Sequence, residues 1–229
     1  MRPPGYDDWG QTPDARRPPH VSILIPSCGQ RALANLARDA IAAFTPDVSH
    51  DVRLLDHAWA RRGWPQIGSV AVGESLTQLA AGLAVARPSH VFVMHDDALP
   101  LYAGWLSYLL QQPGPVTGVK LTEGTKMAHG SGVLFTYAAF RAVDLRPDLP
   151  HRDAGEAPAD WCAPSLCWRP SRVERQGHGL DPTWWRRFSC DVSFDDEAAP
   201  FYVHFGGGSL NNRPDRDAWI GAARQALGL

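Results

Sequence analysis

The sequence has few cysteines and no long hydrophobic run. Its four cysteines, Cys28, Cys162, Cys167 and Cys190, show no CxxC spacing, which argues against a zinc ribbon and against a disulfide framework. No stretch approaches the roughly 18 apolar residues that a membrane span requires, and the N-terminal residues carry no hydrophobic signal core. We therefore expect a cytoplasmic protein with reduced thiols and no transmembrane segment.

A surplus of basic residues is also missing. The formal net charge is -2 and the sequence pI is near 6.5, whereas nucleic-acid-binding domains are usually strongly basic. Of the 22 cationic residues 20 are arginine, which leaves a local basic patch open. With 229 residues, 44% of them hydrophobic, the chain is long enough to bury a substantial core.

The sequence does contain an alternation of strand-like and helix-like segments. Apolar or β-branched runs predict strands at 21–25, 52–55, 90–94, 116–121, 130–136 and 201–204. Pro26 is expected to stop the first of these strands. Apolar residues at helical spacing predict helices at 31–44, 74–86, 105–110, 138–143 and 215–227. This order of elements predicts an α/β fold.

Two proline-rich segments fall outside this alternation. Residues 1–19 carry five prolines and mixed charges, and we expect them to form an extended tail. Residues 20–229 are expected to form a single domain. Within it, residues 145–200 are dense in Pro, Trp, Arg and Asp with little periodicity, which predicts a loop-rich lid or acceptor-binding region.

Two adjacent carboxylates, Asp96 and Asp97, follow directly after the apolar strand 90–94. Their mutual repulsion destabilises a fold unless a cation shares the site. Hard divalent cations such as Mg²⁺ or Mn²⁺ take oxygen ligands, and carboxylates commonly bridge them to substrate phosphates. Ligands of open α/β sheets also gather beyond the carboxyl ends of the strands. The alternative is a solvated turn that caps the following helix.

The order of motifs resembles that of glycosyltransferases with the GT-A fold, especially the inverting family 2 type. Val21–Pro26 with Ser27 looks like the opening strand and nucleotide-binding loop, and Val91–Asp97 looks like the strand that ends in a DxD motif. Gly130–Phe140 is similar to the strand and helix on the acceptor side. His204-Phe-Gly-Gly-Gly-Ser209 resembles a late H-x-G-G-S segment. The resemblance covers roughly residues 20–210 and implies a Rossmann-like, mostly parallel sheet flanked by helices.

The resemblance also implies roles for single residues. Asp97 takes the last position of the acidic motif and would ligate Mn²⁺ or Mg²⁺, with Asp96 in the middle position. His95 stands where the family usually has its first Asp. Pro26, Ser27 and Asp56, together with Asp96, would bind the nucleotide of a nucleoside-diphosphate sugar. For Asp56 a plain strand-end turn is an equal alternative.

The catalytic base of inverting relatives is the Asp of an "ED" pair at the start of a later helix. The nearest match here is Ala159-Asp160, with Glu156 as a displaced alternative. A carboxylate near the acceptor hydroxyl can take its proton as the oxygen attacks the anomeric carbon. Other acids of the region are rivals, namely Asp153, Asp181 and the run Asp195–Glu197, which is first interpreted as a solvated loop.

A histidine and three glycines close the predicted site. His204 could ligate the metal or the diphosphate, since imidazole serves both roles. Backbone N–H groups of the glycine run Gly206–Gly208 could hold anionic oxygens. The alternative is a strand-end histidine whose ring is satisfied by the backbone.

Aromatic and basic residues gather in the loose region. The tryptophans Trp161, Trp168, Trp184 and Trp185 could stack on a sugar or base of the acceptor, or could simply belong to the core. Arg169, Arg172, Arg175, Arg186 and Arg187 could grip phosphate, or could merely solvate a face.

These observations favour a metal-dependent, inverting glycosyltransferase that moves a sugar from a nucleoside-diphosphate sugar to an acceptor hydroxyl. The acceptor is open between a glycan, a small molecule, a protein and a modified nucleic acid. One alternative is a nucleotidyltransferase with a related sheet, for which the loop after Pro26 is a faint match. Another alternative is a catalytically inactive binding or assembly module that keeps the fold.

Overall fold

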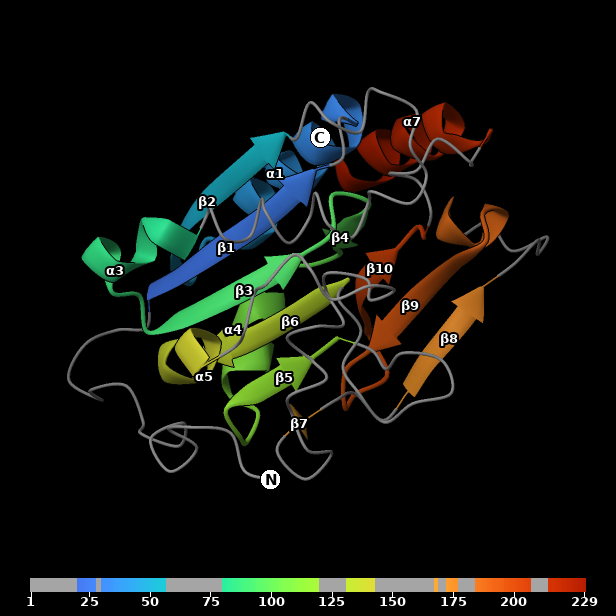
Figure 1. Cartoon of the computed structure of the whole chain (residues 1–229). Helices are drawn as coiled ribbons and strands as arrows, with labels where there is room; N and C mark the ends of the chain where they lie inside the picture. The colour runs from blue at the N-terminus through green and yellow to red at the C-terminus, as the bar shows by residue number, and fades with distance from the viewer. Residues whose placement is uncertain are drawn as a thin grey trace, which may run out of the picture.

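The computed structural model describes residues 20–27, 30–56, 80–119, 131–142, 167–168, 172–176, 184–206 and 214–229. These residues form two sheets with helices packed around them (Figure 1). The predicted tail of residues 1–19 lies outside the described part of the chain. In the described part, every helix is too short or too polar to span a lipid bilayer.

The first sheet is the mixed, mostly parallel sheet that the sequence predicts. Its six strands follow the order β2-β1-β3-β6-β5-β7, and β6 runs antiparallel to both of its neighbours while the other pairs are parallel. The expected α/β class is thereby confirmed. The strands are β1 (His20–Ser27), β2 (Ser49–Asp56), β3 (His90–Met94), β5 (Val116–Gly118), β6 (Gly132–Thr136) and β7 (Cys167–Trp168).

Pro26 does not stop the first strand, because β1 continues to Ser27 and pairs with β2 along its whole length. Proline lacks a backbone N–H and therefore disrupts a strand that is paired on both sides. The pairing of β1 with β3 runs only from Val21 to Leu24, so Pro26 lies beyond it. At Pro26, β1 is paired with β2 alone, so the missing N–H of proline does not cost a hydrogen bond to β3.

A second, antiparallel sheet was not expected from the sequence. Its four strands follow the order β4-β10-β9-β8, and they are β4 (Ala98–Pro100), β8 (Arg172–Gln176), β9 (Cys190–Phe194) and β10 (Pro200–His204). Part of the region predicted to be loop-rich is therefore sheet. Pro100 ends β4. In Figure 1 the arrows of β3 and β5 point toward this second sheet, whereas β6 runs away from it.

The helices agree with the predicted periodicity where they are described. They are α1 (Arg31–Phe44), α3 (Leu83–Ala86), α4 (Trp105–Leu110), α5 (Tyr137–Ala142), the short 3₁₀ helix η3 (Trp184–Arg187) and α7 (Arg216–Leu227). Helix α1 buries Leu33, Leu36 and Ile41 at the predicted spacing. Two side-chain contacts fasten α7 to this helix region, since Arg224 reaches Asp39 at 3.0 Å and Arg216 donates to Gln30 at 2.6 Å.

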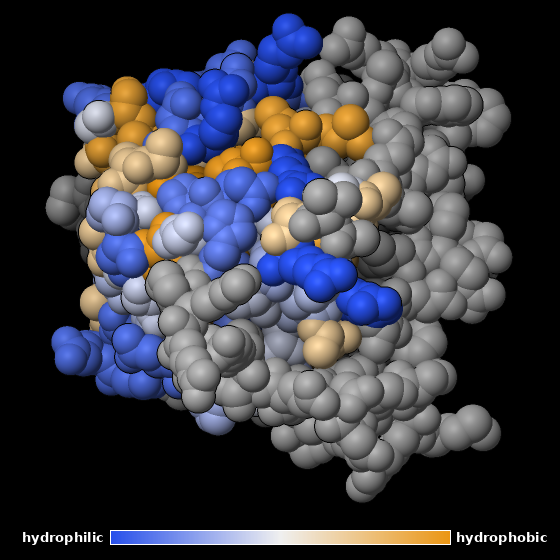
Figure 2. Space-filling model, turned by 90° about the vertical axis from the view of Figure 1, so that its left-hand side faces the viewer, coloured by the Kyte–Doolittle hydropathy of each residue, from blue (hydrophilic) through white to orange (hydrophobic). Residues whose placement is uncertain are grey.

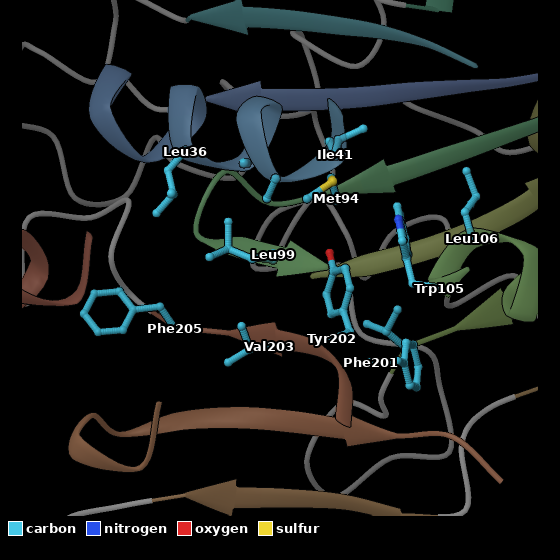
Figure 3. Close-up of a cluster of buried hydrophobic side chains, with 14 of the residues drawn as sticks. Leu36, Ile41, Met94, Leu99, Trp105, Leu106, Phe201, Tyr202, Val203 and Phe205 are labelled. Carbon is cyan, nitrogen blue, oxygen red and sulfur yellow. The ribbon is translucent and has the colours of Figure 1, made fainter. Parts of the chain in front are cut away.

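The hydrophobic core joins helix α1 to both sheets. Figure 3 shows Leu36 and Ile41 from α1, Met94 from β3, and Tyr202 and Val203 from β10 within one cluster. Trp105 of α4 is fully buried there, packs edge-on against Phe92 at 5.1 Å, and donates its indole N–H to Thr45. Burial of each such side chain contributes about 1.5–3 kcal/mol, so the core fixes the two sheets relative to each other.

Candidate metal and nucleotide site

Three consecutive residues, His95 to Asp97, connect the two sheets. Strand β3 ends at Met94 in the first sheet, and β4 begins at Ala98 in the second. Strand β10 pairs with β4 so that His204 lies opposite Ala98, and the Phe205 N–H donates to the Asp97 carbonyl at 2.9 Å. This pairing places His204 beside Asp97, although more than a hundred residues separate them in the sequence.

His95, Asp97 and His204 form a compact group that we call the metal cluster. The Asp97 Oδ1 atom lies 3.3 Å from His204 Nε2 and 3.9 Å from His95 Nδ1. One ligand atom from each residue lies within 4.8 Å of the other two, and the two imidazole rings meet at an interplanar angle of 62°. The Asp97 side chain is 2% exposed and that of His204 8%, so these two side chains are almost closed to bulk water.

The chemistry of this donor set fits a divalent metal ion. Imidazole nitrogens and carboxylate oxygens bind such ions at about 2.0–2.2 Å, so two ligands of one ion are at most about 4.4 Å apart. The two measured separations from Asp97 fall within that span. Sequence analysis predicted Asp97 and His204 as ligands, and the structure brings these two side chains together. It adds His95, which had been noted only as a departure from the expected acid.

A buried carboxylate at this place needs a favourable environment, because desolvation disfavours its charged form. Tyr202, which lies two residues before His204, is fully buried and donates its hydroxyl to the Ser131 carbonyl at 2.6 Å. Burial raises the pKa of Tyr202 well above its usual value, and the nearby Asp97 charge raises it further. Tyr202 is therefore neutral, and it ties β10 to the start of β6 beneath the metal cluster.

The ends of strands β1, β2 and β3 lie together at the edge beside the cluster. Ser27, the last residue of β1, donates its hydroxyl to Asp96 at 2.7 Å, and both side chains are buried. Ser27 is also paired in register with Asp56, the last residue of β2. Four residues expected to bind the nucleotide, Pro26, Ser27, Asp56 and Asp96, thus come from the same edge of the sheet. Asp96 links β1 to the connection between the sheets, which is a role distinct from that of Asp97.

Asp191 is a further acid at the site that the sequence did not single out. It lies on β9 directly opposite His204 on β10, and its Oδ2 atom is 3.7 Å from His204 Nδ1. The two nitrogens of this ring thus face two different carboxylates. Metal-binding histidines commonly direct their second nitrogen toward such a carboxylate, which orients the ring.

Several other candidates from the sequence lie outside the described residues. They are Asp160, Glu156, Asp153, Asp181 and the glycines Gly207 and Gly208. Gly206 is described, and its φ of +68° is a left-handed conformation that favours glycine directly after the metal cluster.

The acidic run Asp195–Glu197 is a turn, as its first interpretation had it. It connects β9 to β10, and the Asp195 side chain accepts the backbone N–H groups of Glu197 and Ala199. The turn pairs Phe194 with Pro200, and an irregularity between Pro200 and Tyr202 then shifts the register so that Asp191 lies opposite His204. Trp184 belongs to the core, where it packs against Trp219 at 5.7 Å.

Comparison with known proteins gives similarities at the level of structure alone. No protein-family model matches the chain, and no curated protein matches it in sequence. Among solved structures, the chain is similar to the galactosyltransferase LgtC in complex with donor and acceptor sugar analogs, with a TM-score of 0.49 and 11% identity over 91% of this chain and 96% of that one. It is also similar to the mannosyltransferase PcManGT from Pyrobaculum calidifontis in complex with GDP-Man and Mn2+, with a TM-score of 0.41 and 14% identity over 65% of this chain and 55% of that one.

A third similar structure is mouse xyloside xylosyltransferase 1, with a TM-score of 0.37 and 12% identity over 73% of this chain and 89% of that one. All three are distant in sequence, and their TM-scores lie below 0.5. A function for the chain therefore has to follow from its own residues.

Proposed function

We propose that the chain is a metal-dependent glycosyltransferase that uses a nucleoside-diphosphate sugar as donor. The observation that carries this proposal is the position of the metal cluster. Asp97, His95 and His204 converge directly beyond the carboxyl end of β3, beside the ends of β1 and β2. This edge is where open α/β sheets bind nucleotides, and a metal held there would lie next to the diphosphate of a bound donor.

The residues of the site divide into two groups in this proposal. Asp97 and His204, together with His95, would hold the metal, which would supply positive charge beside the departing diphosphate. Pro26, Ser27, Asp56 and Asp96 form the edge that receives the nucleotide. The low exposure of Asp97 excludes water from the carboxylate and strengthens its interaction with a cation.

Transfer further requires a base for the acceptor hydroxyl. We propose Asp160 for this role, on the resemblance to inverting enzymes, with Glu156 as the alternative. Inversion at the anomeric carbon follows from a single displacement in which a carboxylate takes the proton of the attacking hydroxyl. The acceptor class is left open between glycan, small molecule, protein and modified nucleic acid.

A donor screen tests the proposal. We expect one of UDP-, GDP- or dTDP-sugars to raise the melting temperature of the protein when Mn²⁺ is present and not when EDTA is present, because binding to the folded state stabilises it. The same donor should then be hydrolysed slowly in the absence of a cognate acceptor, with water in place of the acceptor hydroxyl. NMR of the released sugar should show the anomer opposite to that of the donor.

Two results would contradict the proposal. Stabilisation by a nucleoside triphosphate with pyrophosphate release would indicate a nucleotidyltransferase instead. A protein that responds to none of the donors, with or without metal, would be the inactive binding module.

A further inference from the structure

The metal cluster contains a single carboxylate, because a histidine occupies the position of the first acid. We propose that His95 is the residue that sets the metal selectivity of the site. The pair of imidazoles and the single carboxylate make the site select transition-metal ions such as Mn²⁺, Co²⁺ or Zn²⁺ and discriminate against Mg²⁺. This inference rests on the metal site of the proposed function and narrows the ion that it takes.

The first argument is the chemistry of the donor atoms. Mg²⁺ is small and strongly hydrated, and proteins bind it through carboxylate and phosphate oxygens. Imidazole nitrogens suit first-row transition metals, whose affinity for a nitrogen-containing site rises along the series from Mn²⁺ to Cu²⁺. An acid at position 95 would supply a second negative oxygen ligand, whereas neutral His95 supplies a nitrogen and no charge.

The second argument is that the ring of His95 is held where it can act. Its side chain is 17% exposed, its Nδ1 atom faces Asp97 Oδ1 at 3.9 Å, and its ring centroid is 5.4 Å from that of His204. The His95 backbone N–H also donates to the Ser131 carbonyl, the same atom that Tyr202 binds. The backbone hydrogen bond thus holds the His95 ring next to Asp97, the carboxylate of the metal cluster, where the ring can act as a ligand.

The third argument concerns the neighbouring carboxylates. Asp96 accepts a hydrogen bond from Ser27 through Oδ2, on the side of the β1 end. Asp191 faces His204 Nδ1, whereas Asp97 faces Nε2 of the same ring. Among the described residues, the group that can converge on one ion is therefore His95, Asp97 and His204.

The test measures metal binding by the full chain without donor. After removal of metal with EDTA, Mn²⁺ affinity is measured by EPR, and the affinities of Co²⁺ and Mg²⁺ by competition against it. We expect Mn²⁺ and Co²⁺ to bind about tenfold or more tightly than Mg²⁺. Pulsed EPR of bound Mn²⁺ should resolve couplings to two imidazole nitrogens, a readout that needs no variant.

A substitution then tests the role of position 95 itself. His95→Asp should raise Mg²⁺ affinity and lower the ratio of Mn²⁺ to Mg²⁺ affinity about tenfold, with the coupling of one nitrogen lost. The matched control is His50→Asn on β2, where the wild-type ring contacts the Val48 carbonyl, away from the metal cluster. This control should leave both affinities unchanged.

Three outcomes would overturn the inference. They are equal affinity of the wild-type protein for Mg²⁺ and Mn²⁺, coupling to one nitrogen only, and no metal binding at all. Because these measurements contain no donor, they are independent of the glycosyltransferase proposal. Tight, selective Mn²⁺ binding by a protein that uses no donor would uphold the selectivity of His95 and refute the transferase.

Discussion

Two groups of histidine and aspartate lie at opposite ends of the first sheet. The metal cluster, His95, Asp97 and His204, is at the carboxyl ends of the strands. The second group, which we call the β1–β2 network, lies near their amino ends and contains His20 and Asp51 together with Arg53. Figure 2 looks onto this second end, where hydrophilic residues alternate with smaller hydrophobic patches. The two groups share residue types, but the charged groups around the carboxylate differ between Asp51 and Asp97.

In the β1–β2 network the charge of Asp51 is balanced within the protein. Arg53 donates to it at 2.7 Å, Ser22 at 2.6 Å, and the His20 ring lies 3.0 Å away. Burial raises the pKa of Asp51, but the hydrogen bonds from Arg53, Ser22 and His20 and the Arg53 charge outweigh it, and the pKa lies below its usual value.

Asp97 is far more buried, and its side chain lies within ion-pair distance of His204 and His95. A histidine balances the charge only when it is protonated. The comparison thus separates a network that contains an arginine from a cluster of two imidazoles and a carboxylate, which is the donor set of a metal site. The first contributes to stability, and the second is where function should be lost on mutation.

The largest expected effect is the contrast between Asp97→Asn and Asp51→Asn. Asp97→Asn should abolish Mn²⁺ binding and reduce donor turnover at least about 100-fold, because it removes the only carboxylate of the metal cluster. Metal-free at pH 8, the same variant should be as stable as the wild type or more so, since it replaces a buried anion with a neutral amide. Urea unfolding in EDTA and the turnover assay measure the two effects.

Asp51→Asn should show the opposite pattern. It leaves Mn²⁺ binding and turnover unchanged and lowers the free energy of unfolding, because the Arg53 hydrogen bond loses its charged acceptor. If Asp51→Asn lost activity and Asp97→Asn kept it, the assignment of the two groups would be reversed.

Asp191→Asn should weaken Mn²⁺ binding about 10–100-fold, the usual cost of losing a carboxylate that orients a metal-bound histidine. The wild-type Nδ1 to Oδ2 separation of 3.7 Å is that of an ion pair, so the effect depends on charge as well as orientation. Asp191→Glu should restore part of the affinity, which a merely structural role would not predict. Equal Mn²⁺ affinity in the wild type and Asp191→Asn would remove Asp191 from the site.

Much of the first sheet and two of the three residues of the metal cluster, Asp97 and His204, could be proposed from the sequence. The unbroken apolar segment of β3 and the spacing of α1 are signals that short-range physics produces. The order of motifs suggested that Asp97 and His204 belong to one site. In the structure, the pairing of β4 with β10 brings the two residues together. His95 was missed because an acid was expected at its position, and a ring nitrogen can occupy the same place.

Asp191 could not be found in this way. It lies on a strand of five residues inside a region without clear periodicity, and its position opposite His204 depends on the register of a hairpin. The signal that was available is the acidic run itself: Asp195 accepts two backbone N–H groups as a turn residue does. Interpreted as a hairpin turn, Asp195–Ala199 would have placed Asp191 opposite Val203, because the irregularity between Pro200 and Tyr202 that shifts its partner to His204 has no signal in the sequence.

The amino end of β3 offers a pH test, since it also carries a histidine. Burial lowers the pKa of His90 to about 4, below the value of about 6.5 for an unfolded chain. Between these pH values the unfolded chain binds a proton that the folded chain does not, so stability falls as the pH drops from 6.5 to 4. His90→Gln should lessen this loss by on the order of 2 kcal/mol, after allowance for the solvent that still reaches the ring.

Urea unfolding of the metal-free protein at pH 7 and pH 4.5 measures this effect. Identical slopes of stability against pH in the wild type and His90→Gln would show that the ring is protonated in the folded state. Because His90 lies away from the metal cluster, the variant should bind Mn²⁺ as the wild type does.

The smallest expected effect comes from Arg53→Gln in the β1–β2 network. The ion pair with Asp51 is partly exposed, with side-chain exposures of 25% and 35%, so its loss should cost only about 1 kcal/mol of unfolding free energy. NMR titration should show the pKa of Asp51 rising, because burial still disfavours the charged carboxylate while the Arg53 hydrogen bond and charge are gone. The ionised Asp51 side chain contributes to stability until the pH falls through its pKa in the folded state. With that pKa raised in Arg53→Gln, the contribution should be lost at a higher pH during acidification. An unchanged pKa of Asp51 would mean that Ser22 and His20 alone stabilise the charge, and Arg53 would not be the residue that holds the pKa of Asp51 down.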